Sequence, residues 1–322
     1  MTTHLLPRPR PQAAWHTRWQ RRLARYRRKM QILKIWRQQQ FIRDQHILLN
    51  ISGLLSEPLR DAARLLRANT RYHRDLSKKR HDEQSASTLH RIRQRLTCPQ
   101  ANSYRQLIEA DPRSRIIVCF HFGNFVYGMP YLKSLEPRSR PVLLLIQSQP
   151  GDEYFHNMRI ALPESHTHEA QFLLSNNTNP RQLLRHLRKS PCSLYLFCDL
   201  PDTFGATGEV SFLSRPAQFP RGAASLALLA GVPLLPVITL CKDKQDIVTL
   251  GNQLEPTRYP NESREDATTR LSQQLVDFFA PHFRQHPEHW KFLPFLPGYM
   301  AAPAAPNTNT TVNHQPTSQR RG

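Results

Sequence analysis

The sequence lacks the cysteine patterns of disulfide-rich and zinc-binding proteins. Its five cysteines are an odd number and contain no Cys-x-x-Cys pair. Cys119, Cys198 and Cys241 lie in or beside apolar, strand-like runs. We therefore interpret the cysteines as reduced core residues of a cytosolic protein, and we expect neither disulfides nor a metal site from them.

Long uninterrupted apolar runs are also missing. The longest candidate, residues 225–240, is broken by Gly231, Pro233 and Pro236, so it predicts a helix, a turn and a strand. No apolar core follows the basic start of the chain, which excludes a cleavable signal peptide of the usual kind. These absences favour a protein that does not span a membrane.

Acidic residues are scarce relative to basic ones. The chain has 45 Lys and Arg against 24 Asp and Glu, a formal net charge of +21. A protein surface with this excess of positive charge attracts phosphate groups, acidic proteins or nucleic acid. Apolar residues make up 39% of the 322 residues, below the roughly 45–50% of a typical globular protein. The shortfall lies mostly at the two ends, so the core is expected between them.

Residues 1–43 contain twelve Lys and Arg and no acid. Apolar residues recur there every three or four positions, which predicts an amphipathic helix within a basic arm, residues 1–50. An aromatic stripe beside arginines favours an anionic membrane surface, on which the helix would lie flat. The alternatives are packing on the protein's own body and, least favoured, nucleic-acid binding. The stripe comprises Trp15, Trp19, Leu23, Tyr26, Met30, Leu33 and Trp36.

The central part, residues 51–300, predicts an α/β domain with a mixed, mostly parallel sheet flanked by helices, because short apolar runs alternate with helical segments. A Pro-, Asn- and Thr-rich tail, residues 301–322, is expected to be disordered. The expected strands are 115–120, 141–147, 193–199, 234–240 and 247–251. The expected helices lie within 53–95 and at 101–110, 152–162, 180–189, 220–230 and 264–284.

His121 directly follows the first of these strands, in the segment CFHFGNFVYG. Ligands of open α/β sheets bind beyond the carboxyl ends of strands, so the imidazole is a candidate general base, open to a hydroxyl substrate. A helix starting near Asn124 or Phe125 would direct free N–H groups there, and Gly123 permits close backbone approach. A single histidine at a strand end is also commonly structural, and both interpretations stay open.

Four segments occur in the order found in one enzyme family. They are HFGNF (121–125), LFCDLPDTFG (196–205), VSFLSRPAQFPRGAASLALLAGVPLLPV (210–237) and HPEHWKF (286–292). Together they resemble the lipid A biosynthesis acyltransferases, the lauroyl and myristoyl transferases of the lysophospholipid acyltransferase superfamily, over roughly residues 50–295. The resemblance implies a glycerol-3-phosphate acyltransferase-like α/β fold. It also implies transfer of an acyl chain from acyl carrier protein or coenzyme A, with no other cofactor.

The family signature places Asp or Glu four residues after the histidine, where this chain has Val126. The acid normally holds the imidazole in its productive tautomer. Three explanations are open. Another acid replaces it, with Asp199 the first candidate and Asp202 the second; His121 acts alone, assisted by Tyr127 or the backbone; or the chemistry has been lost.

Other residues are candidates for substrate binding. The resemblance suggests Arg159 as a ligand of a phosphate on the donor or acceptor. Arg221 precedes Gly222 at the start of a small-residue helix and is a second, weaker candidate for binding an anion. Gly123, Asn124 and Phe125 would lie beside the substrate. Aromatic residues near His121, including Phe122 and Tyr127, would line an acyl channel or belong to the core.

The sequence therefore predicts an acyltransferase whose acceptor is a hydroxyl or amine of a lipid, glycolipid or natural product. It would work at the cytoplasmic face of the bacterial inner membrane, bound peripherally. The alternative is a catalytically silent relative that binds acyl chains or partners an active enzyme. A positive surface would speed the encounter with an acidic acyl carrier protein.

Overall fold

The chain divides into two compact units, residues 1–66 and 67–322, and the boundary falls inside helix α2 (Leu59–Asp82). In the first unit, residues 43–55 are helical, with Ile47 and Ile51 buried on one face. Most of the basic arm and the whole tail lie outside the described residues. The computed structural model describes residues 43–82, 94–137, 139–146, 170–174, 179–201, 205–243 and 245–300.

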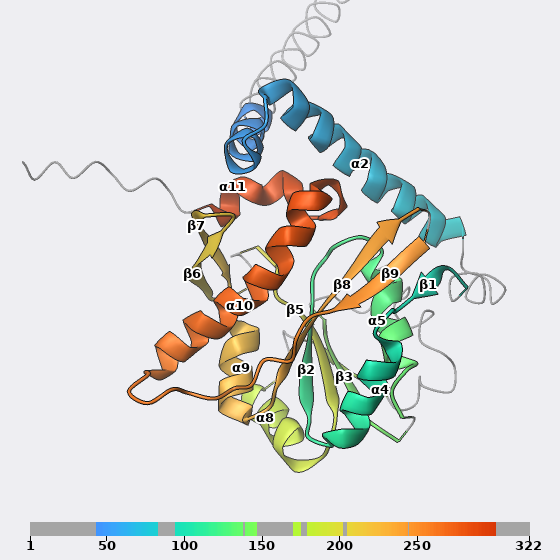
Figure 1. The fold of residues 1–322 in the computed structure, drawn as a ribbon, viewed down its shortest axis with the longest axis vertical. Coiled ribbons are helices and arrows are strands. Elements are labelled where there is room, and N and C mark those ends of the chain that lie inside the picture. The colour runs from blue at the N-terminus through green and yellow to red at the C-terminus, as the bar shows by residue number, and fades with distance from the viewer. Residues whose placement is uncertain are drawn as a thin grey trace, which may run out of the picture. The chain divides into compact units, whose positions relative to one another are not determined.

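A seven-stranded sheet forms the centre of the second unit (Figure 1), in the order β1-β9-β8-β2-β5-β3-β4. All neighbouring strands are parallel except β8 and β9, which form an antiparallel pair. The predicted mixed, mostly parallel sheet is therefore confirmed. Its strands are β1 (Leu96–Thr97), β2 (Arg115–Cys119), β3 (Val142–Ile146), β4 (Ala170–Leu174), β5 (Ser193–Phe197), β8 (Leu234–Lys242) and β9 (Gln245–Leu250).

Helices flank this sheet, with α4 and α5 on one side and α8, α9 and α10 on the other (Figure 1). Local signals set their ends. Asn179 accepts a hydrogen bond from the N–H of Arg181 at the start of α8, and Ser263 and Asp266 form a capping box at the start of α10. The helices are α4 (Ala101–Ala110), α5 (Phe125–Lys133), α8 (Pro180–Lys189), α9 (Gly222–Ala230), α10 (Arg264–Gln285) and α11 (Leu296–Tyr299), with short 3₁₀ turns η2 (Pro287–His289) and η3 (Leu293–Phe295).

A separate hairpin, β6 (Thr207–Phe212) and β7 (Arg215–Pro220), was not expected from the sequence. Its turn residues, Leu213 and Ser214, both adopt positive φ, at 51° and 66°. That conformation is usual for a two-residue hairpin turn but normally takes Asn or Gly, so the turn has no recognisable signal. The side chain of Gln273 on α10 pairs with both the N–H and the carbonyl of Ser211. Tertiary contacts therefore help to hold the hairpin.

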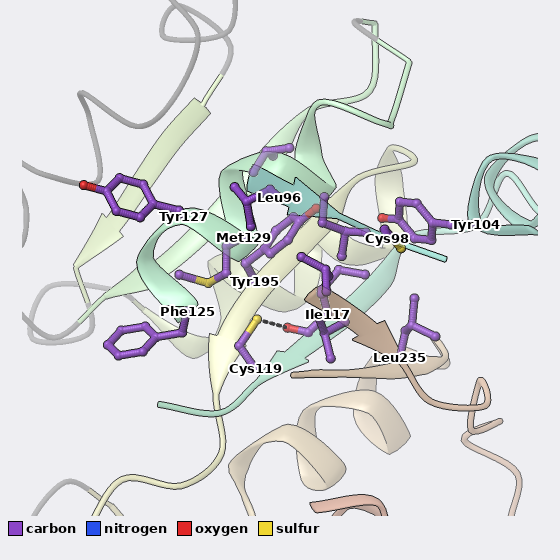
Figure 2. Packing of buried hydrophobic residues seen from close by; sticks show 14 of the residues in the cluster. Leu96, Cys98, Tyr104, Ile117, Cys119, Phe125, Tyr127, Met129, Tyr195 and Leu235 are labelled. Carbon is purple, nitrogen blue, oxygen red and sulfur yellow. Dashed lines mark hydrogen bonds between the residues drawn. The ribbon is translucent and has the colours of Figure 1, made fainter. Parts of the chain in front are cut away.

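The apolar cluster between α5 and the sheet supports the end of β2. Figure 2 shows Ile117 and Cys119 of β2, Phe125 and Met129 of α5, and Tyr195 of β5 among its members. All of these side chains are buried. Because the cluster fixes both β2 and the first turn of α5, it holds the intervening segment, residues 120–124, in a defined conformation.

Candidate active site

His121 and Asp199 meet at the carboxyl edge of the sheet. β2 and β5 are parallel neighbours in which Cys119 lies opposite Phe197, and each polar residue comes two positions later. The imidazole Nδ1 lies 2.8 Å from Oδ1 of Asp199. The backbone N–H of His121 donates to Oδ2 of the same carboxylate at 2.7 Å. Strand register thus brings together two residues that are 78 positions apart in sequence.

The carboxylate of Asp199 is held from several sides. Its exposed fraction is 0%, and the indole N–H of Trp290 donates to Oδ2 at 2.9 Å. The hydroxyl of Tyr299 donates to the Asp199 backbone carbonyl at 2.7 Å. Two donors therefore occupy Oδ2, which leaves Oδ1 directed at the imidazole. Such charge-assisted hydrogen bonds are stronger than neutral ones and fix the carboxylate's orientation.

This arrangement selects one imidazole tautomer. A carboxylate accepts hydrogen bonds, so Nδ1 of His121 carries the proton and Nε2 carries the lone pair. A histidine held in this way can accept a proton at Nε2 while the carboxylate stabilises the imidazolium that forms. The pair therefore has the components of a general-base dyad, although the acid comes from a neighbouring strand.

The imidazole is more enclosed than the sequence predicts, with only 7% of its side chain exposed. It stacks on Phe197 with ring centroids 3.8 Å apart and meets Phe125 and Phe292 edge-on at 4.8 and 4.9 Å. Phe197 and Phe292 are themselves only half-buried. An aromatic layer of three rings therefore covers the imidazole, and two of these rings are partly exposed.

Val126, separated from His121 by four residues, belongs to the apolar core. Its side chain is completely buried in the cluster beneath α5. A carboxylate at this position would be buried among apolar groups, which is costly without a partner. In this chain Asp199 supplies the carboxylate beside His121, and position 126 has a packing role.

The predicted substrate-binding residues Gly123, Asn124 and Phe125 make contacts within the protein. The N–H of Gly123 donates to the carbonyl of His289 at 2.9 Å. The buried amide of Asn124 donates to Asp246 at 3.0 Å. Phe125 packs on the imidazole and in the core. These contacts give the segment a structural role, and substrate contact by these residues stays a prediction.

Of the two candidate anion-binding arginines, Arg221 lies within the described residues. Arg221 lies at the N-terminal cap of α9 and forms an ion pair with Glu265 of α10. Arg159 and the second acid candidate, Asp202, lie outside the described residues. Phe122 is fully buried and packs on Phe279, which makes it a core residue.

Trp290, Phe292 and Tyr299 complete the site, and sequence reasoning gave none of them a role. Trp290 and Phe292 belong to the segment HPEHWKF, whose resemblance to a closing family element was the one signal near them. Residues 121 and 291 are joined because the N–H of Lys291 donates to the His121 carbonyl at 2.9 Å. This pairing of two loops depends on tertiary folding and leaves no local sequence pattern.

The neighbouring cysteines do not supply a nucleophile. Cys119 and Cys198 precede the dyad residues along their strands, and both are buried. Burial is the main cause that raises the pKa of each thiol, and the charge of Asp199 adds to the effect. Thiols of this kind stay protonated at neutral pH and are inert. The chemistry of the site therefore depends on the imidazole and the carboxylate.

Neither a scan of family models nor a search of curated proteins gives a match to the chain. Within the described ranges, no helix is both long and apolar enough to cross a bilayer. The geometry of His121, Asp199 and their surroundings is therefore the basis for inferring a function.

Proposed function

We propose that this protein is an acyltransferase that moves a fatty acyl group from an acyl carrier protein or coenzyme A thioester to a hydroxyl or amine. The acceptor is a lipid, glycolipid or natural product. The observation that carries the proposal is the contact of 2.8 Å between His121 and a carboxylate at the end of the neighbouring parallel strand. In this proposal Asp199 supplies the acid that the sequence lacks at position 126.

The proposed reaction needs no covalent enzyme intermediate. Nε2 of His121 takes the proton of the acceptor hydroxyl as its oxygen attacks the thioester carbonyl. The C–O bond forms, the C–S bond breaks, and the imidazolium returns its proton to the leaving thiolate. Asp199 holds the ring and stabilises the transient positive charge. The acceptor reaches Nε2 by displacing part of the half-buried aromatic layer at Phe197 and Phe292.

Charge around the site supports an anionic donor. Lys291 is exposed, and its ammonium group lies 5.9 and 5.8 Å from the ring centroids of Phe125 and Phe292. Coenzyme A and the prosthetic arm of acyl carrier protein both carry phosphate, which a cation at this edge would attract. The mixed α/β sheet is also compatible with a glycerol-3-phosphate acyltransferase-like fold, and the basic arm with peripheral attachment to the inner face of a membrane.

The first test measures consumption of acyl carrier protein and coenzyme A thioesters in the presence of a crude lipid extract. We expect His121→Ala and Asp199→Asn each to lower the rate by about 10²–10⁴-fold, because the base or its correct tautomer is lost. Asp277→Asn, which changes an exposed acid on α10, should leave the rate unchanged. Equal thioester consumption by the wild type and His121→Ala would refute enzymatic acyl transfer.

A second function is favoured by the enclosure of the imidazole. A protein that retains the fold but only binds an acyl chain, or partners an active enzyme, would have no need to expose Nε2. Fatty acid retained by the purified protein and by Asp199→Asn alike, with no turnover in either, would support this alternative. Loss of turnover with retained binding in Asp199→Asn alone would favour the acyltransferase.

A further inference from the structure

A cluster of histidine and carboxylate side chains lies next to the dyad, in the segment that joins α10 to Trp290. His286, Glu288 and His289 belong to one short turn, and Pro287 restricts its backbone. One nitrogen from each histidine and one oxygen of Glu288 all lie within 4.8 Å of one another. We propose that these three side chains bind a divalent transition-metal ion, with Zn²⁺ as the best match.

The distances in this cluster fit ligands of a common ion better than hydrogen bonds. Oε1 of Glu288 lies 3.7 Å from Nδ1 of His286 and 3.7 Å from Nε2 of His289. A separation of that length is too great for a hydrogen bond. Two ligands of a tetrahedral Zn²⁺ ion with ordinary bond lengths lie about 3.3 Å apart, so only small side-chain shifts are required.

The type of donor atom points to the class of metal. Two imidazoles and one carboxylate form a set that Zn²⁺ uses where a fourth position stays open to water or another ligand. Hard ions such as Mg²⁺ and Ca²⁺ prefer oxygen ligands throughout. The two nitrogen donors therefore favour Zn²⁺ over Mg²⁺ and Ca²⁺.

The turn is held in place before any ion binds. Asn69 on α2 donates to the carbonyl of Glu288 at 2.9 Å and to that of Trp290 at 2.7 Å. The carbonyl of His289 accepts the N–H of Gly123. A fixed backbone lowers the entropic cost of bringing the ligands together.

The exposure of the cluster is also compatible with metal binding. His289 is 7% exposed, whereas His286 and Glu288 are 35% and 27% exposed, so one side of the cluster faces solvent. An ion could therefore reach the three side chains from solution.

An ion at this position would stabilise the turn whose next residue, Trp290, donates to Asp199. The metal site does not depend on acyl transfer, because its three ligands take no part in the proposed reaction. Failure of the thioester assay and failure of the metal test are therefore separate results.

The test uses the full chain, purified without a histidine tag and stripped with a chelator. Zn²⁺ is titrated by calorimetry in the presence of excess Mg²⁺, and thermal unfolding is followed with and without Zn²⁺. We expect His286→Ala and Glu288→Gln each to weaken one Zn²⁺ site by about 100-fold or more, since loss of a ligand costs at least as much as loss of an outer-shell partner. Zn²⁺ should raise the midpoint of unfolding of the wild type and not of these variants.

His186→Ala is the matched control, because this half-buried histidine lies on α8, away from the turn. It should bind Zn²⁺ as the wild type does. His286 and Glu288 are both partly exposed, so their variants should fold, and unfolding without Zn²⁺ verifies this. If the two variants bind Zn²⁺ as tightly as the wild type, or if the wild type binds none, the proposed site is wrong.

Discussion

Gly123 controls the geometry of the candidate site at the scale of one residue. Its φ of +56° lies in the left-handed region. A Cβ built at this position would approach the carbonyl oxygen of Thr239 to 2.1 Å. His121, which contacts Asp199, lies two residues before Gly123 in the same segment. Glycine is therefore required both by the backbone conformation and by the closeness of β8.

We predict that Gly123→Ala lowers the free energy of unfolding by about 2 kcal/mol or more. Left-handed backbone in a residue other than glycine costs on the order of 1–3 kcal/mol, and the contact with Thr239 adds to this. Urea denaturation measures the change. Gly205→Ala is the control, since a Cβ there meets nothing within 4 Å. Equal stability of the two variants would contradict this role of Gly123.

The connection between α4 and β2 shows how elements are joined by charge. Asp111, at the C-terminal cap of α4, pairs with Arg113 at 2.8 Å, and Arg113 also contacts Glu255 at 3.2 Å. The hydrogen bonds from Arg113 lower the pKa of Asp111 to about 2, against an ordinary value of 3.8. The ionised carboxylate is thus favoured by folding, and its contribution to stability depends on pH.

Because the pKa of Asp111 is lower in the folded state, its contribution is fully present above about pH 4 and is lost as the pH falls towards 2. We predict that Asp111→Asn reduces the decline in the free energy of unfolding between pH 4 and pH 2. Denaturant titrations across this range measure the slope. Glu109→Gln, an exposed acid on the same helix, should keep the wild-type slope. A slope unchanged in Asp111→Asn would show that the pair does not influence acid unfolding.

Most of the main strands and helices were predictable, because their signals are local. The helices at 101–110 and 180–189 match α4 and α8, and β2, β5 and β8 fall within or beside the expected runs. The predicted helix at 152–162 lies outside the described residues. The β6–β7 hairpin and the strands β1 and β4 were missed, because their pairing depends on other parts of the chain rather than on propensity.

Charge asymmetry is the main feature at the scale of the whole molecule. The net charge of +21 includes twelve basic residues and no acid in the first 43 positions. These positions also carry the aromatic stripe. The prediction that this arm binds an anionic membrane is based on these two features of the sequence. Each basic residue near such a surface contributes about 1 kcal/mol.

We predict that replacing Arg21, Arg25 and Arg28 by Gln in the full chain weakens binding to anionic vesicles by about 100-fold, from about 3 kcal/mol in total. Flotation with phosphatidylserine-containing and neutral vesicles measures the partitioning. Replacing Arg181, Arg185 and Lys189 on α8 removes the same charge and should have a smaller effect. Similar losses in both variants would mean that net charge, rather than the arm, governs attachment.

The sequence by itself determined the class of fold, the place of His121 at a strand end and the absence of an acid at position 126. These features depend on local periodicity and composition, which can be determined from residues that are close together in the sequence. Only the tertiary structure decided that Asp199 lies against the imidazole of His121 and that Trp290 donates a hydrogen bond to Asp199. It also decided that three aromatic rings cover the imidazole. The His121–Asp199 contact joins residues 78 positions apart through strand order and register. The Trp290–Asp199 contact joins residues 91 positions apart through a loop. A single sequence carries no local pattern for either contact.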